Sequence, residues 1–376
     1  MKKVVLIPDS FKGTMSSTRI CEIMESAIHQ YHPEIEVVSV PVADGGEGSV
    51  DAFLSAMGGE KVELPVKGPY FEDVTGFYGI VNGGTAIIEM AACAGLPMVG
   101  DKKCPDLTTT YGVGQLMVHA AEHGCKKIVV GLGGSATNDA GTGAAAAAGV
   151  KFYDKDGKAF IPAGGTLSKI DKIDMSGLHP ALKGLPIVTM CDIDNPLYGE
   201  NGAAYIFAPQ KGADADMVRF LDENLRAFAE TAQRDLGLDV SRIEGGGAAG
   251  GMGAGMAAFF QSKLQMGIET VLDTVGFDEL IQDADLVFTG EGKLDSQSLR
   301  GKVVIGVARH TKRFGVPLIA VVGCIGDPID SVYEEGVTAV FTTLRAVATF
   351  EEIKLRCEAD LSRTMENLMH LFRWKE

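Results

Sequence analysis

The chain has 376 residues, of which 46% are hydrophobic, and its formal net charge is -16. This length and composition predict a soluble globular protein of two domains with a large buried core. A field of this sign repels phosphate backbones and anionic membrane surfaces, so nucleic acid and membranes are excluded as partners. An anionic substrate would instead need local positive charge from lysines, helix N-termini or a divalent metal ion.

The segment MKKVVLIPDS opens the chain with two lysines, but its apolar stretch covers only Val4 to Ile7 and no cleavage-like sequence follows. We therefore expect a buried strand rather than a secretory signal, and a cytoplasmic protein. No apolar run reaches the roughly 18 to 20 residues of a membrane-spanning helix. The seven cysteines are scattered and never spaced as C-x-x-C, which argues against disulfides and cysteine zinc sites.

Taken from the N-terminus, the pattern predicts a strand at 4–8, a helix at 17–31 and a strand at 36–40. The middle of the chain has its own alternation of strands and helices. Its strands are expected in the apolar segments TAIIEMA (85–91), KKIVVG (126–131), LPIVTMC (185–191) and YIFAP (205–209).

The C-terminal part repeats the alternation of the N-terminal part. It predicts strands at 284–290, 317–323 and 338–343, a helix at 303–314 and a long final helix from about 350. The fold class is therefore α/β with two α/β domains. We predict one doubly wound, Rossmann- or flavodoxin-like domain from residues 1–83 and 284–376, and a large inserted α/β domain from 84–283. Two consecutive domains are the alternative.

The segment GLGGSATNDAGTG at 131–143 follows a predicted strand and precedes a helix rich in small residues. Glycines permit a tight turn and close backbone approach, and a helix N-terminus presents free N–H groups to an anion. The segment therefore predicts a phosphate cradle formed by Gly133, Gly134, Ser135, Thr137 and Asn138.

Three interpretations of this segment stay open at this point. The letters GLGGSA fit the dinucleotide pattern G-x-G-x-x-A, and Asp154 lies about 20 residues downstream, so an NAD-dependent oxidoreductase is one. The loop is also similar to that of the galactokinase and homoserine kinase superfamily, which wraps the phosphates of ATP. Thirdly, glycine and alanine can serve only close packing of a helix and a strand.

Four further turns place polar side chains directly after predicted strands, where ligands bind in open α/β sheets. Each could also be an ordinary solvated turn. The pair Asp192 and Asp194 resembles a magnesium site. The four turns are DSFKG (9–13), with Ser10 and Lys12; ADGGEG (43–48), with Asp44; CDIDNP (191–196); and GEGKLD (290–295), with Lys293 and Asp295.

Together these segments resemble the type I glycerate kinases, bacterial enzymes that phosphorylate D-glycerate with ATP. The resemblance rests on segments that span nearly the whole chain. They are PDSFKG (8–13), PVADGGEGSVDAF (41–53), GLGGSATNDAGTG (131–143), CDIDNPLYGENGAAYIFAPQKGA (191–213), GGGAAGGMGAG (245–255) and GEGKLDSQSLRGK (290–302). One departure is that Lys293 and Ser298 stand where the family often has Arg and Thr, and lysine cannot copy the bidentate fork of arginine.

The resemblance implies two α/β domains with the active site in the cleft between them, and transfer of the γ-phosphoryl group of ATP to D-glycerate. The product that the resemblance implies is 2-phosphoglycerate. It also implies that Mg²⁺ bridges the phosphates of ATP. A non-catalytic sensor of small acids is a further alternative, and a homo-oligomer stays open.

Phosphoryl transfer needs positioning, charge neutralisation and a group that takes the hydroxyl proton. For the catalytic base or metal ligand we rank Asp192 first, Asp295 second and Asp44 third, with Asp194 as a second metal ligand. The glycerate carboxylate or the transferring phosphoryl group is assigned to Ser10, Lys12, Lys293 and Lys211, and Lys12 is also a catalytic candidate.

Overall fold

The computed structural model describes residues 1–42, 45–295, 298–300, 302–326 and 328–373. The chain forms two compact units. Unit 1 comprises Met1–Asp44, Asp51–Met57 and Met266–Glu376, and unit 2 comprises Gly45–Val50 and Gly58–Gln265. The boundaries predicted at 83 and 283 differ from these. Residues 58–83 belong to unit 2, because their two strands extend its sheet.

Unit 1 is built on a five-stranded sheet in the order β16-β14-β12-β1-β2, in which every neighbouring pair is parallel. The strands are β1 (Lys3–Pro8), β2 (Glu36–Ser39), β12 (Leu286–Gly290), β14 (Leu318–Val322) and β16 (Ala339–Thr342). A small parallel pair joins β13 (Lys293–Leu294) to β15 (Cys324–Ile325). Strand β1 is a continuous apolar run because helices cover both faces of a parallel sheet.

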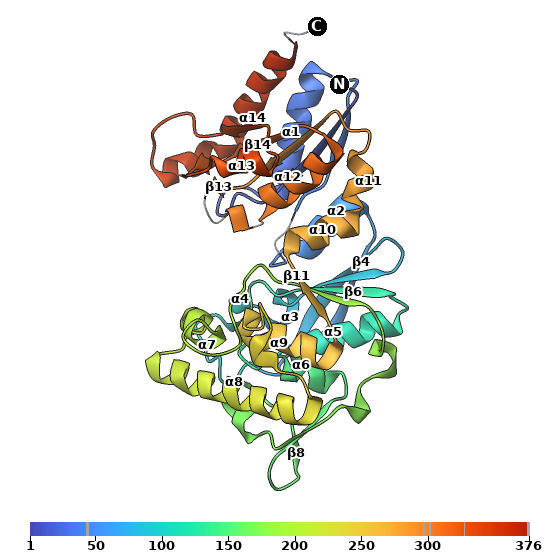
Figure 1. Cartoon of the computed structure of the whole chain (residues 1–376), viewed down its shortest axis with the longest axis vertical. Helices are drawn as coiled ribbons and strands as arrows, with labels where there is room; N and C mark the ends of the chain where they lie inside the picture. The colour runs from blue at the N-terminus through green and yellow to red at the C-terminus, as the bar shows by residue number, and fades with distance from the viewer. Residues whose placement is uncertain (43–44, 296–297, 301, 327, 374–376) are drawn as a thin grey trace. The chain divides into compact units, whose positions relative to one another are not determined.

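The helices of unit 1 include two whose bounds match the prediction at both ends, α1 and α12. The set is α1 (Ser17–Tyr31), α2 (Ser49–Met57, with residues 51–57 in this unit), α10 (Gly267–Val275), α11 (Phe277–Ile281), α12 (Val303–Phe314), α13 (Ser331–Glu335), α14 (Phe350–Arg373) and the 3₁₀ turn η6 (Ser298–Arg300). Helix α1 starts where it does because the Ser16 side chain accepts a hydrogen bond from the backbone N–H of Arg19. Helices α1 and α14 lie side by side in Figure 1, and their apolar faces share a core with β1 and β12.

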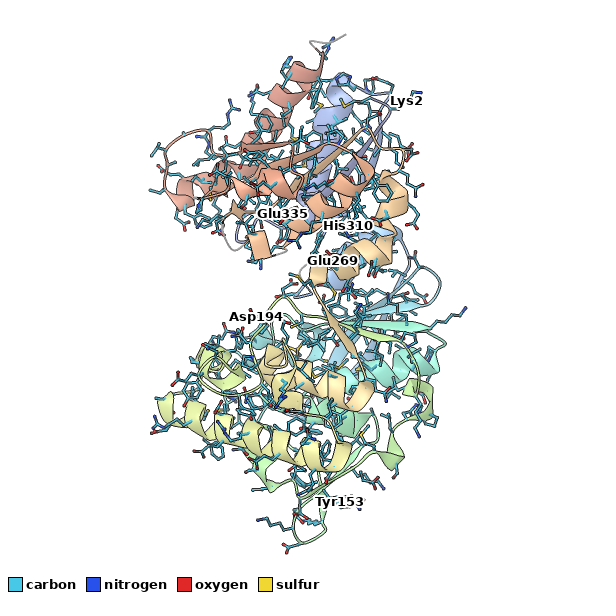
Figure 2. The ribbon with its side chains drawn as sticks, in the orientation of Figure 1. Lys2, Tyr153, Asp194, Glu269, His310 and Glu335 are labelled. Carbon is cyan, nitrogen blue, oxygen red and sulfur yellow. The ribbon has the colours of Figure 1, made fainter. Side chains whose placement is uncertain are left out.

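Residues 266–283 belong to unit 1 because α10 and α11 pack on α12. His310 of α12 is buried between two carboxylates, with Nδ1 2.5 Å from Asp278 Oδ1 and Nε2 3.3 Å from Glu269 Oε2. Figure 2 labels Glu269 and His310. These polar contacts hold the three helices together.

Unit 2 is built on a six-stranded mixed sheet in the order β11-β10-β6-β5-β4-β3. The strands are β3 (Glu60–Lys67), β4 (Asp73–Val81), β5 (Thr85–Glu89), β6 (Lys127–Gly131), β10 (Ile187–Met190) and β11 (Lys263–Gln265). The pairs from β5 to β11 are parallel, whereas β3 and β4 form an antiparallel hairpin at one edge. A separate antiparallel sheet has the order β8-β7-β9, with β7 (Lys151–Tyr153), β8 (Ala159–Phe160) and β9 (Lys172–Asp174).

The helices of unit 2 include one that was predicted as a strand. They are α3 (Ala91–Ala94), α4 (Leu96–Val99), α5 (Tyr111–Glu122), α6 (Thr142–Ala147), α7 (Ala203–Phe207), α8 (Ala215–Leu236), α9 (Ala248–Phe260) and the 3₁₀ helices η1 (Gly164–Lys169), η2 (Met175–Gly177), η3 (Pro180–Leu182), η4 (Pro209–Lys211) and η5 (Val240–Arg242).

The strand predicted at 205–209 was wrong, because this segment contains most of helix α7. Its backbone makes helical hydrogen bonds, for example from Ile206 N–H to the Gly202 carbonyl (3.1 Å). The buried side chains are the small Ala203 and Ala204, whereas Tyr205 and Ile206 are exposed. An apolar run of five residues cannot by itself distinguish a strand from a helical turn.

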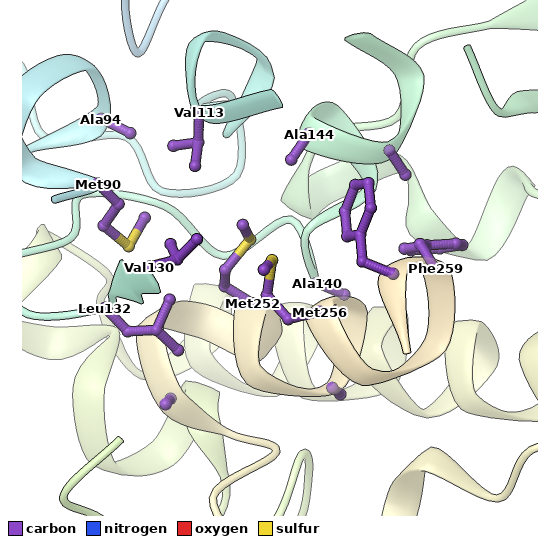
Figure 3. Packing of buried hydrophobic residues seen from close by; sticks show 14 of the residues in the cluster. Met90, Ala94, Val113, Val130, Leu132, Ala140, Ala144, Met252, Met256 and Phe259 are labelled. Carbon is purple, nitrogen blue, oxygen red and sulfur yellow. The ribbon is translucent and has the colours of Figure 1, made fainter. Parts of the chain in front are cut away.

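The core of unit 2 includes the sheet and the buried faces of α5, α8 and α9. Figure 3 shows Met252 and Met256 of α9 between Val130 and Leu132 on one side and the small Ala140 on the other. The glycine-rich segment at 245–259 is closely packed in this arrangement. Among the helices of the described residues, none combines the length and the apolar character that crossing a membrane requires.

Candidate functional site

The loop that follows β6 runs from Leu132 to Gly141, and it is held by direct contact with a second glycine turn. The Gly133 N–H donates to the Gly45 carbonyl (3.0 Å), and a Cβ on Gly131 or Gly133 would overlap the backbone of Gly45 or Gly46. The packing interpretation therefore accounts for Gly133. Gly134 is exposed, with φ of 73°, so its backbone faces outward at the tip of the loop.

The N-terminus of α6 does not present free N–H groups, so this part of the phosphate-cradle prediction was wrong. The carboxylate of Asp139, which is fully buried, lies at the N-terminus of α6, where a phosphate was expected. This carboxylate accepts hydrogen bonds from Gly141 N (3.2 Å), Gly143 N (3.2 Å), Thr110 N (2.8 Å) and Thr110 Oγ1 (2.9 Å). Burial raises the pKa of Asp139, and these four donors act in the opposite direction. Since all four of these groups, from three residues, donate, the arrangement is that of an ionised carboxylate.

Lys211 at the end of η4 reaches the same loop. Its Nζ donates to Ser135 Oγ (2.8 Å) and to the Thr137 carbonyl (2.6 Å), and the residue is only 2% exposed. Burial lowers the pKa of Lys211 to about 7, against the opposing charge of Asp139. The structure thus brings together Lys211, Ser135 and Thr137, which the sequence had assigned separately to substrate and to nucleotide.

The glycine-rich segment before and within α9 packs against the backbone of this loop. Ala249, Gly250 and Gly251 have consecutive left-handed conformations, with φ of 53°, 68° and 90°. The Gly250 carbonyl accepts from Ala140 N–H (3.1 Å), and a Cβ on Gly250 would overlap the Thr137 carbonyl. Only glycine therefore fits at residue 250.

Asn138 belongs to the loop after β6 and is fully buried where this loop contacts Gly250. Within the described part of the chain, neither its Oδ1 nor its Nδ2 has a hydrogen-bond partner. An unsatisfied buried amide is costly. Asn138 is consequently the cradle residue with unused hydrogen-bonding capacity.

The acids predicted to hold metal follow β10, which is the parallel neighbour of β6. Met190 at the end of β10 pairs with Gly131 at the end of β6. Asp192 and Asp194 therefore leave the sheet at the same edge as the loop. Both are exposed, and Asp194 is labelled in Figure 2.

Glu89 was not chosen from the sequence and ends β5, the other neighbour of β6. It pairs in register with Gly131, is buried, and its Oε2 accepts from Val50 N–H (3.1 Å). A buried acid at the last position of an apolar strand was the available signal. Three parallel strands of unit 2 thus end in polar groups at one edge of its sheet.

The residues predicted in unit 1 gather where β1 and β12 end side by side. Asp9 N–H donates to the Gly290 carbonyl (2.8 Å), and Gly292 packs on the backbone of Phe11 and Lys12. The chain winds away from this point in both directions, from β1 to β2 and from β12 to β14 and β16. Such switch points are where open α/β sheets bind ligands.

The turn after β12 pairs two of the predicted residues with each other. Lys293 Nζ lies 3.0 Å from Asp295 Oδ2, and this hydrogen bond raises the pKa of Lys293. Ser10 lies on the neighbouring turn after β1, half-buried, and Lys12 is exposed there. Asp44 falls outside the described residues.

Glu291 is a second acid that sequence reasoning missed, although it lies in the quoted segment GEGKLD. It is buried, and burial raises its pKa to about 7, helped by Asp9 and Asp295 and opposed by a hydrogen bond from Ser298 and by Lys302. Its Oε1 has no hydrogen-bond partner among the described residues. The signal was an acid directly after a fully buried strand.

The dinucleotide alternative fails on the position of Asp154. A ribose-binding acid would end a strand next to β6 in the parallel sheet. Asp154 instead follows β7 of the antiparallel sheet, and its Oδ1 accepts from Asp156 N–H (3.0 Å) and Lys158 N–H (2.9 Å) of its own turn. It is a turn residue.

A model of the glycerate kinase family matches residues 4–373. The chain belongs to this family. It is therefore a kinase, which takes ATP as its phosphoryl donor and acts on a small molecule. Family membership agrees with the resemblance stated from the sequence motifs and does not support the galactokinase or homoserine kinase alternative.

Glycerate kinases from several bacteria align with nearly the whole chain. A glycerate kinase of Bacillus cereus is 43% identical and covers 99% of this chain and 98% of its own. A glycerate 2-kinase of Escherichia coli is also 43% identical, covering 97% of each chain. A crystal structure from Salmonella typhimurium LT2, described as a glycerate kinase 2, superposes with a TM-score of 0.89 at 38% identity, covering 100% of this chain and 99% of that one. The predicted α/β class is confirmed.

Proposed function

We propose that this glycerate kinase family member transfers the γ-phosphoryl group of ATP to D-glycerate and releases 2-phosphoglycerate, with Mg²⁺ as the metal. The names of the relatives support glycerate as the substrate, and that of the Escherichia coli enzyme supports the 2-position. The phosphate site is inferred chiefly from Lys211, whose buried amine contacts the loop after β6. The chain has a net charge of -16. Anion binding in such a chain requires a cation placed for it.

In unit 2 the polyphosphate lies on the loop at its exposed Gly134, with the buried Ser135 and Lys211 next to it. Asn138 lies fully buried further along the same loop. Asp192 and Asp194 fit Mg²⁺, which takes one or two carboxylates and completes its shell with phosphate oxygens and water. The described residues contain no group of three or more His, Cys, Asp or Glu side chains that could hold a metal ion, so a cage made of protein alone is not the arrangement proposed. Bound Mg²⁺ would neutralise charge on the phosphates.

In unit 1 the glycerate carboxylate lies at the β1–β12 switch point, with Ser10, Lys12 and Lys293 as its partners. Asp192 is the first candidate for the base that takes the hydroxyl proton, and Asp295 the second. The placement of the site relative to the two units, the cytoplasmic location and a homo-oligomer stay predictions.

The test is a coupled ADP-release assay with D-glycerate, ATP and Mg²⁺, followed by phosphorus NMR of the product. We expect turnover that requires all three components, and a phosphomonoester at the 2-hydroxyl. Asp192→Asn should lower kcat at least about a hundredfold, as expected for loss of a base or metal ligand. Asp216→Asn, an exposed acid on α8, is the matched control and should leave kcat unchanged. Absence of turnover with glycerate would overturn the proposal, and a 3-phosphate product would overturn its regiochemistry.

A further inference from the structure

The environment of the Lys211 amine has two hydrogen-bond acceptors. They are Ser135 Oγ at 2.8 Å and the Thr137 carbonyl at 2.6 Å. A neutral lysine amine has two N–H groups, and an ammonium has three. The two acceptors therefore satisfy the neutral amine in full and leave one donor of the charged form to find a further acceptor.

The charges around Lys211 do not supply that further acceptor. Asp139, the acid that interacts with it electrostatically, already accepts four hydrogen bonds from the backbone and side chain of its own surroundings. Lys103, on the segment that packs against Gly212, is exposed, and its Nζ donates to the Gln210 carbonyl (3.4 Å). Burial lowers the pKa of Lys211 to about 7, so the empty site holds this amine largely neutral above that pH.

A phosphate oxygen bound at the loop would change both the number of hydrogen-bond acceptors around the Lys211 amine and the charge near it. It would accept the third N–H, and its negative charge would favour the ammonium form. Charge-assisted hydrogen bonds of this kind are stronger than neutral ones. Ligand and proton therefore stabilise each other in this site.

We propose that Lys211 takes up a proton from solvent when the polyphosphate of ATP or ADP binds to the loop after β6, and releases it when the nucleotide leaves. The proton adds to the lone pair of Nζ, and no other bond forms or breaks. The inference rests on the proposed nucleotide site. Its consequence is that nucleotide affinity falls as the pH rises above neutrality, and that the empty protein does not bury an unpaired cation.

The test is calorimetry of Mg²⁺–ADP binding at pH 8 in buffers of different ionisation enthalpy, which gives the number of protons exchanged. At this pH the phosphates are already ionised, because their second pKa is about 6. We expect uptake of about 0.9 proton per ADP by the wild type. Lys211→Arg stays charged and should bind ADP with uptake near zero. Lys103→Arg, the matched control, should retain the wild-type value.

Three calorimetric results would overturn the proposal. They are an absence of uptake in the wild type, equal uptake in Lys211→Arg, and an absence of ADP binding, of which the last would also remove the proposed nucleotide site. Glycerate phosphorylation without uptake would overturn only the role of Lys211. Should the larger guanidinium prevent folding, the wild type alone suffices, since its Kd for ADP should rise about tenfold per pH unit from pH 8 upward. A flat Kd there would contradict the inference.

Discussion

Two glycine-rich turns of this protein can be compared, the loop after β6 in unit 2 and the turn after β12 in unit 1. Each is associated with a buried ionisable side chain, which is a lysine at the first turn and a glutamate at the second. Each turn follows a largely buried parallel strand. For the loop after β6 the buried side chain is Lys211 of η4, and for the turn after β12 it is Glu291. Burial moves both pKa values to about 7, downward for the lysine and upward for the glutamate. Near neutral pH, both groups are therefore poised to gain or lose a proton.

The partners of the two groups differ, and the difference indicates what each turn can bind. The Lys211 amine makes two hydrogen bonds and has a third N–H to offer when charged, which suits an anion. Glu291 leaves Oε1 without a partner in the described part of the chain, which suits a hydrogen-bond donor or a proton. The comparison supports the proposal that phosphate binds in unit 2 rather than at the turn of unit 1.

The contact between Gly250 and the loop after β6 can be disrupted by substitution. Gly250→Ala places a Cβ against the Thr137 carbonyl in a left-handed conformation, and should destabilise the protein by more than about 3 kcal/mol or prevent folding. Gly237→Ala has a similar φ of 72° but open space around it, and should cost only about 1 kcal/mol. Denaturant unfolding measures both. Equal losses would mean that backbone strain alone, and not the close contact, fixes Gly250.

The internal anion of the same loop can be tested with Asp139→Asn. An amide cannot accept all four hydrogen bonds, so we expect a loss of about 2 to 3 kcal/mol in the free energy of unfolding. Asp154→Asn in the exposed turn after β7 keeps an oxygen that can accept from both backbone N–H groups, and should change stability by less than about 0.5 kcal/mol. A wild-type stability for Asp139→Asn would show that the carboxylate does not hold the start of α6.

The turn of unit 1 is tested by Glu291→Gln. Because its pKa is raised from 4.5 to about 7, folded protein keeps a proton that unfolded protein releases, and wild-type stability falls as the pH rises through that interval. Glutamine stays neutral, so the variant should be more stable by about 1 to 2 kcal/mol at pH 8, with no gain at pH 4. Thermal unfolding at both pH values measures this.

Glu352→Gln is the control for the Glu291 experiment. Glu352 is exposed, and hydrogen bonds from Thr349 N–H and Oγ1 lower its pKa, so its carboxylate form is the one that folding favours. This variant should show no gain at pH 8. A pH-independent difference between Glu291→Gln and the wild type would mean that Glu291 is not protonated in the folded protein.

Much of the fold could be predicted from the sequence because its signals are local. Buried parallel strands such as β1 and β14 are continuous apolar runs, and the cap residues Ser16 and Gly315 define where α1 starts and α12 ends. Where local signals are short they failed, as in the five residues of α7. The hairpin of β3 and β4 was assigned to the wrong unit because pairing with β5 is not a local property.

The site was predicted less completely, for the same physical reason. Glycines and acids predicted turns that do follow parallel strands, but the contact between Lys211 and Ser135 joins residues 76 positions apart. Nor can a sequence reveal that Asp139 fills the helix N-terminus expected to hold phosphate, or that Glu291 is buried with an unpartnered oxygen. These depend on tertiary packing.

The measurement that tests the central claim most directly is a crystal structure with Mg²⁺–ADP. We predict a phosphate oxygen within about 3 Å of Lys211 Nζ, beside Gly134 and Ser135. Phosphates bound away from residues 131–138, with Lys211 still in contact only with Ser135 and Thr137, would contradict the account.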